Sequence, residues 1–222
     1  MSSPQIIQVA NELQLNQAIA TVDGATSGSY IIQFTADITE GTDTGGVITF
    51  NGTTLAAPAD LYALNLQTGV TLTIDGQGHM LSGADTYRGF FAYAGAVTIR
   101  SLAIDNTVAQ GGNGGAAKYY AGGAGAGLGG GLFVGSGAQV ALSSVTFSGD
   151  QARGGNGGSY SPSAPLYAGG GGLGGKGGIG GGGIGVGASG GGSGAAPGSG
   201  IVPGVASGGG AASGYTGAGG GI

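Results

Sequence analysis

Cysteine is absent from this sequence, and charged residues make up only 7% of it. Without cysteine the chain has no disulfide, no thiolate metal site and no cysteine nucleophile. An average globular protein has roughly 25% charged residues, so few side chains here are available for acid–base or ionic chemistry. The absence of cysteine suits a cytosolic protein and also an exported protein that stays unlinked, so it leaves the compartment open.

Positive charge is sparse and dispersed. The five basic residues are Arg88, Arg100, Lys118, Arg153 and Lys176. Nucleic acids and anionic membrane surfaces both require clustered lysine or arginine, so we exclude nucleic acid as a partner. No apolar run approaches the roughly 20 residues of a transmembrane helix, and we expect no direct membrane insertion. No signal peptide is visible after Met1, so an exported form would have had its signal removed.

Glycine divides the chain into two halves of different composition. Of the 59 glycines, 12 lie in residues 1–110 and 47 in residues 111–222. The first half contains patterns of secondary structure. Residues 10–22 have apolar positions at helical spacing, with Asn11 as a suitable N-cap and an end near Gly24. The spacing then changes to two, which predicts strands at 30–34, 47–50, 64–66 and 70–74.

A repeat with an offset of 43 residues follows these strands. Residues 97–115 and 140–158 both consist of alternating apolar residues followed by Gly-Gly-Asn-Gly-Gly. The corresponding apolar positions are Val97 with Val140, Ile99 with Leu142, Leu102 with Val145 and Ile104 with Phe147. Upstream, residues 89–91 correspond to residues 131–134. The last residues, 219–222, look like the start of a third unit.

The repeat predicts stacked coils of strands. Apolar residues at i and i+2 face one side, and a two-residue break precedes the next such pair. One coil cannot bury this face alone, so successive coils stack and pair in parallel. We therefore predict an all-β protein, a parallel β-helix (solenoid) with a short N-terminal capping helix and long glycine-rich loops.

Three parts are expected along the chain. Residues 1–28 form the N-terminal cap with the helix, and residues 29–158 form the coils. A glycine-rich insert near 112–130 interrupts these coils. Residues 159–222 form a glycine-rich segment that ends at the start of another coil.

The chain also resembles a known family. The resembling segments are 11–22, 34–38, 70–79, 129–134 and 145–149, in that order. Together they are similar to the start of passenger domains of bacterial autotransporters and related pectin-lyase-like surface proteins. The resemblance implies a right-handed β-helix, an N-terminal cap, export from a Gram-negative cell and display at its surface. Because only a few coils are present, we expect a fragment of a longer passenger.

The glycine-rich segments allow three interpretations. The first is a flexible loop, because ordering a glycine-rich chain costs much backbone entropy and few side chains offset it. The second is a set of polyproline-II-like strands that pack closely because no Cβ separates them. Their contact face would contain Leu173, Ile179, Ile184 and Val186. The third is a disordered coat.

Nucleotide and calcium motifs in these segments are set aside. Residues 125–130 match the GxGxxG pattern, but this match is expected by chance in such a composition. Residues 170–176 match GxxxxGK, but Gly177 stands where a P-loop needs serine or threonine. Calcium-binding nonapeptides need aspartate, whereas Asn113 and Asn156 stand here. We predict no cofactor site and no metal site.

Enzymatic chemistry has a small set of candidates. Polysaccharide lyases and hydrolases on β-helices use clustered Asp with Arg or Lys, and the available residues are Asp75, Asp105, Arg100, His79 and Arg88. Asp75 and Asp105 lie at strand ends, where aspartate commonly caps turns. We therefore predict no catalytic residue and no enzyme. A polysaccharide lyase or hydrolase of pectin-lyase-like fold remains an alternative.

Tyrosines lie beside the glycine-rich segments. They are Tyr87, Tyr93, Tyr119, Tyr120, Tyr160 and Tyr167. We expect them to fix the loops against the β-helix, and the alternative is stacking on sugars or on another chain.

These observations predict a non-enzymatic structural protein of the bacterial cell surface or extracellular space, of the adhesin or passenger type. An alternative is an extracellular fibre subunit that stacks through an open β-helix end near Ile222. The expected partners are further copies of the chain and, as an alternative, a host or matrix glycan or protein.

Overall fold

The computed structural model describes residues 3–42, 45–57, 60–178 and 181–184. The chain divides into two compact units, each built from two separate stretches. Residues 1–108 and 129–151 form what we call the strand unit. Residues 109–128 and 152–222 form what we call the glycine unit.

The helix α1 (Glu12–Asp23) follows the first strand, β1 (Gln5–Val9). Asn11 caps the helix, because its side-chain oxygen accepts a hydrogen bond of 2.9 Å from the Gln14 amide. Gly24 ends the helix, and its amide donates to the Ala20 carbonyl. The predicted helix, its cap and its end are thus confirmed, with the start two residues later than expected.

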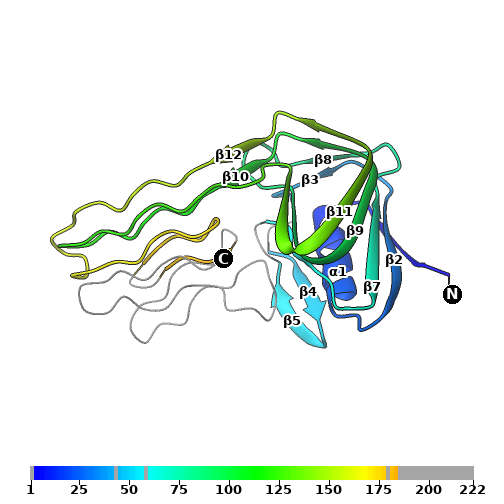
Figure 1. Cartoon of the computed structure of the whole chain (residues 1–222), viewed down its shortest axis with the longest axis horizontal. Helices are drawn as coiled ribbons and strands as arrows, with labels where there is room; N and C mark the ends of the chain where they lie inside the picture. The colour runs from blue at the N-terminus through cyan, green and yellow to red at the C-terminus, as the bar shows by residue number, and fades with distance from the viewer. Residues whose placement is uncertain (1–2, 43–44, 58–59, 179–180, 185–222) are drawn as a thin grey trace. The chain divides into compact units, whose positions relative to one another are not determined.

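The strand unit contains an eight-stranded sheet in which all neighbours pair in parallel (Figure 1). Besides β1, the strands are β2 (Gly28–Phe34), β3 (Ile38–Thr39), β6 (Leu64–Asn65), β7 (Val70–Asp75), β8 (Met80–Ser82), β9 (Phe90–Asp105) and β11 (Leu132–Ser148). A separate pair is formed by β10 (Val108–Gln110) and β12 (Gln151–Arg153). The all-β fold class is therefore confirmed.

Apolar side chains form ranks across the parallel strands. In one rank, Ile32 of β2 pairs with Ile74 of β7, which pairs with Ile99 of β9, which pairs with Leu142 of β11. The three isoleucines are fully buried. All four apolar correspondences predicted from the 43-residue repeat occur in the β9–β11 register. The ranks place the core on one face of these strands.

The long strands turn at corners with left-handed backbone. Ser101 in β9 has φ 51°, and Ser144, 43 residues later in β11, has φ 55°. These two serines occupy the two-residue break that the repeat predicted. A second corner recurs at Asn106 (φ 50°) and Gly149 (φ 69°). The corners redirect the chain at the same place in each repeat.

A hairpin lies next to the helix. It consists of β4 (Val47–Phe50) and β5 (Thr53–Ala56), which pair in antiparallel fashion. Asn51 (φ 47°) and Gly52 (φ 78°) form the turn, with the two positive φ angles of a type I′ hairpin. With β2, β6 and β7, the strand β4 also confirms the four strands predicted before residue 76.

The glycine unit consists of extended segments joined by hydrogen bonds at intervals of three residues. The amides of Gly111, Gly114 and Ala117 donate to the carbonyls of Arg153, Asn156 and Ser159. Other segments run in the opposite direction, since Gly122 and Gly125 donate to Gly115 and Gly112. Three residues per turn is the repeat of the polyproline-II helix. Figure 1 shows residues 109–128 and 152–178 as extended traces within this unit.

Glycine is required in these segments because the backbones approach one another closely. A Cβ placed on Gly112, Gly122 or Gly125 would overlap the carbonyl oxygen of a neighbouring segment. Gly123, which lies between the last two, has open space where its Cβ would be. Among the described residues, the segments are hydrogen-bonded and closely packed, as the second interpretation expects.

Two of the residues predicted for the contact face of this packing are buried. Leu173 is 5% exposed and Ile184 is 6% exposed. The other two, Ile179 and Val186, lie outside the described residues, as do residues 219–222, where a third unit is predicted.

Candidate functional site

The enzymatic candidates make structural contacts and do not come together in one cluster. Asp75 and Arg100 are paired in register on β7 and β9. The Arg100 Nε and Nη2 atoms donate to Asp75 Oδ2 at 3.0 and 2.6 Å. Burial alone would raise the pKa of Asp75, but these bonds and the Gln77 amide hold it below its ordinary value. The pair therefore links two strands as a carboxylate and a guanidinium, and Asp75 stays ionised.

The second predicted carboxylate does not join this pair. Asp105 is at the end of β9, beyond the Ser101 corner, and pairs in register with Ser148 of β11. His79 Nδ1 lies 3.3 Å from Asp37 Oδ1, and this Asp37 oxygen also accepts from the Met80 amide at 2.9 Å. Both contacts fix the chain at a strand end. The structure thus does not assemble the catalytic cluster of the enzyme alternative among these residues.

Arg88 belongs to a buried charge cluster. Its Nε lies 3.9 Å from Asp60 Oδ2, and both side chains are 3% exposed. Burial, and then the carboxylates of Asp60 and Glu12, raise the pKa of Glu40 well above its ordinary value, while the Leu61 amide and Arg88 oppose this. Burial also lowers the pKa of Arg88, against the attraction of Asp60 and Glu40. These charged side chains are all buried inside the strand unit.

The nucleotide-like and calcium-like sequence motifs also lie in described parts of the structure. Residues 125–128 and 170–176 lie in the glycine unit, whereas residues 129–130 of the first motif belong to the strand unit. The Asn113 side-chain oxygen accepts from the Asn156 amide at 2.8 Å, so the two asparagines link the repeats 43 residues apart. No group of three or more His, Asp or Glu that could hold a metal ion occurs within residues 3–42, 45–57, 60–178 and 181–184.

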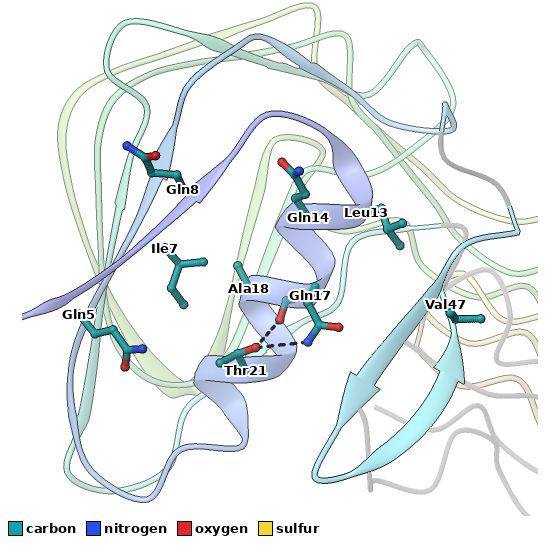
Figure 2. A pocket seen from close by; sticks show the side chains of 9 residues that line it. All are labelled: Gln5, Ile7, Gln8, Leu13, Gln14, Gln17, Ala18, Thr21 and Val47. Carbon is teal, nitrogen blue, oxygen red and sulfur yellow. Dashed lines mark hydrogen bonds between the residues drawn. The ribbon is translucent and has the colours of Figure 1, made fainter.

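One groove opens in the strand unit between β1, α1 and β4 (Figure 2). Its volume is about 490 Å³. The lining consists of uncharged side chains, four of them glutamines: Gln5, Ile7, Gln8, Leu13, Gln14, Gln17, Ala18, Thr21 and Val47. The amides offer hydrogen bonds without charge, so the groove suits binding of a neutral polar group.

The glutamines of this groove also hold its walls. Gln17 binds both backbone groups of Thr49 in β4, accepting from its amide at 2.8 Å and donating to its carbonyl at 2.9 Å. Gln14 accepts from the Ala10 amide at 2.8 Å. These residues were not predicted from the sequence. The spacing of three between Gln14 and Gln17 in a predicted helix was the available signal, since it places both on one helix face.

The last strand, β11, exposes apolar side chains that its neighbour buries. Leu142 is 49% exposed, whereas its rank partner Ile99 is fully buried. Phe147 is 44% exposed, and its partner Ile104 is fully buried. No charged residue and no proline occurs in β11, although both commonly protect edge strands. Among the described residues, this end of the sheet is the candidate contact surface of the strand unit.

Three tyrosines of the glycine unit are exposed at its turns. Tyr119, Tyr120 and Tyr160 are 62%, 57% and 71% exposed. Tyr120 stacks on Tyr167, with ring centroids 5.8 Å apart and an angle of 10° between the rings. The expectation that the tyrosines fix the loops against the β-helix stays a prediction, and Tyr119, Tyr120 and Tyr160 leave more than half of their surface exposed. Of the other predicted tyrosines, Tyr93 stacks on Phe91 in β9.

Charge is segregated between the two units. All ten acidic residues belong to the strand unit, together with Arg88 and Arg100. The glycine unit has three basic residues, Lys118, Arg153 and Lys176, and no acidic one. The two units therefore carry net charges of opposite sign.

No protein-family model, no curated protein and no solved structure matches the chain. Among the described residues, no helix is both long and apolar enough to cross a bilayer.

Proposed function

We propose that the strand unit is a right-handed parallel β-helix with α1 as its N-terminal cap. The apolar ranks repeat from β2 to β11, and corners recur at Ser101 and Ser144. The apolar residues of α1, including Leu15 and Ile19, belong to the same core as Val9 of β1. At the edge of the sheet formed by β1, this helix covers the apolar ranks, as the cap of a solenoid does.

On this fold we propose a non-enzymatic structural role at a bacterial cell surface or outside the cell, of the adhesin or passenger type. The observation that carries it is the use of the enzymatic candidates as structural links. Asp75 holds Arg100, Asp37 holds His79, and Arg88 is buried beside Asp60. The repetitive ranks and the close-packed glycine segments support a rigid scaffold that presents its turns.

Two measurements test this proposal. Antibodies against the chain should label intact cells that express the gene as strongly as permeabilised cells. Labelling that requires permeabilisation would contradict the surface role. The purified chain should also leave polygalacturonate uncleaved. Cleavage that is lost in Asp75→Asn would overturn the non-enzymatic role and favour the polysaccharide-lyase alternative.

A second candidate is self-association through β11. In the part of the chain that the structure describes, β11 pairs only with β9, it has no charged side chain, and Leu142 and Phe147 are about half exposed. We propose that a second copy of the chain covers this rank, β11 against β11. At the β1 end of the sheet, α1 covers the apolar rank, so β11 of one copy cannot stack on the opposite end of another copy. The expected product is therefore a closed two-fold dimer and not a long fibre. The stacking first expected near Ile222 concerns residues outside the described ones.

Electron microscopy and light scattering of the purified chain across a concentration series test this contact. We expect dimers of one size at high concentration. Leu142→Lys places a charge in the apolar rank and should keep the chain monomeric. Thr146→Lys adds the same charge at a position of β11 that is exposed and outside the apolar ranks, and it should leave the dimer intact. Monomers at every concentration would rule out the contact, and long filaments would contradict the covering role of α1.

A further inference from the structure

The exposed tyrosines of the glycine unit form a surface at two neighbouring turns. These turns contain residues 117–121 and 160–167, and we call the surface made by Lys118, Tyr119, Tyr120, Tyr160 and Leu166 the tyrosine tip. Its four apolar members are between 49% and 71% exposed. The described part of the glycine unit has all of its aromatic residues in these two turns. Aromatic side chains are thus gathered at one place on a scaffold that consists mostly of glycine, alanine and serine.

Backbone hydrogen bonds hold the two turns together. The Lys118 amide donates to the Pro165 carbonyl at 2.8 Å, and the Tyr119 amide donates to the Leu166 carbonyl at 3.1 Å. Tyr120 also pairs in a parallel bridge with Tyr167, whose ring it stacks on. The tip is therefore formed before a ligand arrives, and binding orders few further side chains.

The chemistry of the tip selects its ligand. Tyrosine offers an apolar ring face and a hydroxyl, which suits the C–H face and the hydroxyls of a sugar. The Lys118 ammonium lies 5.6 Å from the centre of the Tyr119 ring, so positive charge stands next to the aromatic surface. The glycine unit has no acidic residue to neutralise it. Five side chains offer less area than the roughly 800 Å² per partner of a stable protein interface, which favours a glycan over a protein.

We propose that the tyrosine tip binds a carboxylate-bearing polysaccharide. Sugar rings stack on Tyr120 and Tyr160, and a uronate carboxylate pairs with the Lys118 ammonium. This inference names the ligand class of the surface role proposed above and rests on it.

Calorimetric titration of the full chain with polygalacturonate fragments tests the proposal. Neutral dextran fragments and polyglutamate serve as comparison ligands. We expect polygalacturonate to bind, dextran to bind at least tenfold more weakly, and polyglutamate to bind more weakly still because it has charge without sugar rings. Tyr120→Ala and Tyr160→Ala should each weaken binding several-fold. Both side chains are exposed, so circular dichroism of these variants should match that of the unaltered chain.

Two lysine variants provide a matched control. Lys118→Gln should weaken the binding of polygalacturonate about tenfold, whereas Lys176→Gln removes the same charge from an exposed position outside the tip and should have little effect. Equal losses in both variants, equal binding of polyglutamate, or no binding of polygalacturonate would overturn the proposal. Surface labelling of intact cells does not depend on these titrations. A wrong ligand class can therefore be distinguished from a wrong surface location.

Discussion

Asp23 is a buried carboxylate at the end of α1 whose protonation is coupled to folding. One of its oxygens accepts from the Asn65 amide at 2.9 Å, and the other has no hydrogen-bond partner among the described residues. Burial raises the pKa of Asp23 to about 7, although the Asn65 bond lowers it in part. The neutral form is therefore favoured in the folded protein. Its contribution to stability is complete below pH 3.8 and is lost as pH rises through about 7.

Asp23→Asn tests this coupling. Asparagine keeps an oxygen for the Asn65 amide and cannot ionise. Relative to the unaltered chain, the variant should gain free energy of unfolding between pH 4 and pH 8, on the order of 4 kcal/mol for a pKa shift of about three units. Urea unfolding at several pH values measures the difference. Parallel pH profiles of the two proteins would show that Asp23 ionises freely in the folded state.

The cap of α1 is a second residue whose role is local. The Asn11 side chain satisfies the Gln14 amide, one of the first amides of the helix, which have no partner within it. Asn11→Ala should lower the free energy of unfolding by about 1 kcal/mol. Asn11→Ser keeps a capping oxygen and should cost less than that. Urea unfolding compares the two variants, and an equal loss in both would mean that the cap does not contribute.

At the scale of elements, the glycine unit depends on the close approach of its segments. Gly122→Ala would place a methyl group against the Gly169 carbonyl, and it should destabilise the unit by about 1–3 kcal/mol. Gly123→Ala has open space for the methyl group and should be neutral or stabilise slightly, because alanine loses less backbone entropy. Amide hydrogen exchange of the two variants measures the local stability. Similar exchange rates in both would contradict the tight packing.

The same element shows how far sequence reasoning reaches. Composition alone favoured a flexible loop for the glycine-rich segments, because they have few side chains whose burial could offset the entropy cost of ordering. The hydrogen bonds at intervals of three residues satisfy the backbone, and they depend on segments such as 111–117 and 153–159 lying side by side. The 43-residue repeat contained this information, since Gly111 and Arg153 are 42 residues apart, but only the folded chain shows that the repeat brings the two segments together.

In the strand unit, the contribution of an apolar residue to the free energy of unfolding depends on which strand of the parallel sheet it belongs to. Ile99 and Leu142 share one rank, but Ile99 is fully buried and Leu142 is about half exposed. Ile99→Ala should cost about 2–5 kcal/mol of unfolding free energy, as in other cores. Leu142→Ala should cost much less at low protein concentration. Urea unfolding at low and high concentration tests both. A concentration-dependent cost of Leu142→Ala alone would support the dimer through β11, and equal costs at low concentration would mean that β11 is covered.

Local patterns in the sequence determined the helix with its Asn11 cap, the Asn51–Gly52 turn, and the β9–β11 register. These features depend on residues that interact with near neighbours or with their equivalents in a repeat, so spacing alone specifies them. Only the tertiary structure decided which surfaces remain open. It placed Arg88 in a buried cluster, paired Asp75 with Arg100, exposed the rank of β11, and brought Tyr120 onto Tyr167. Exposure depends on what lies on the far side of a residue, and no pattern along the chain records that.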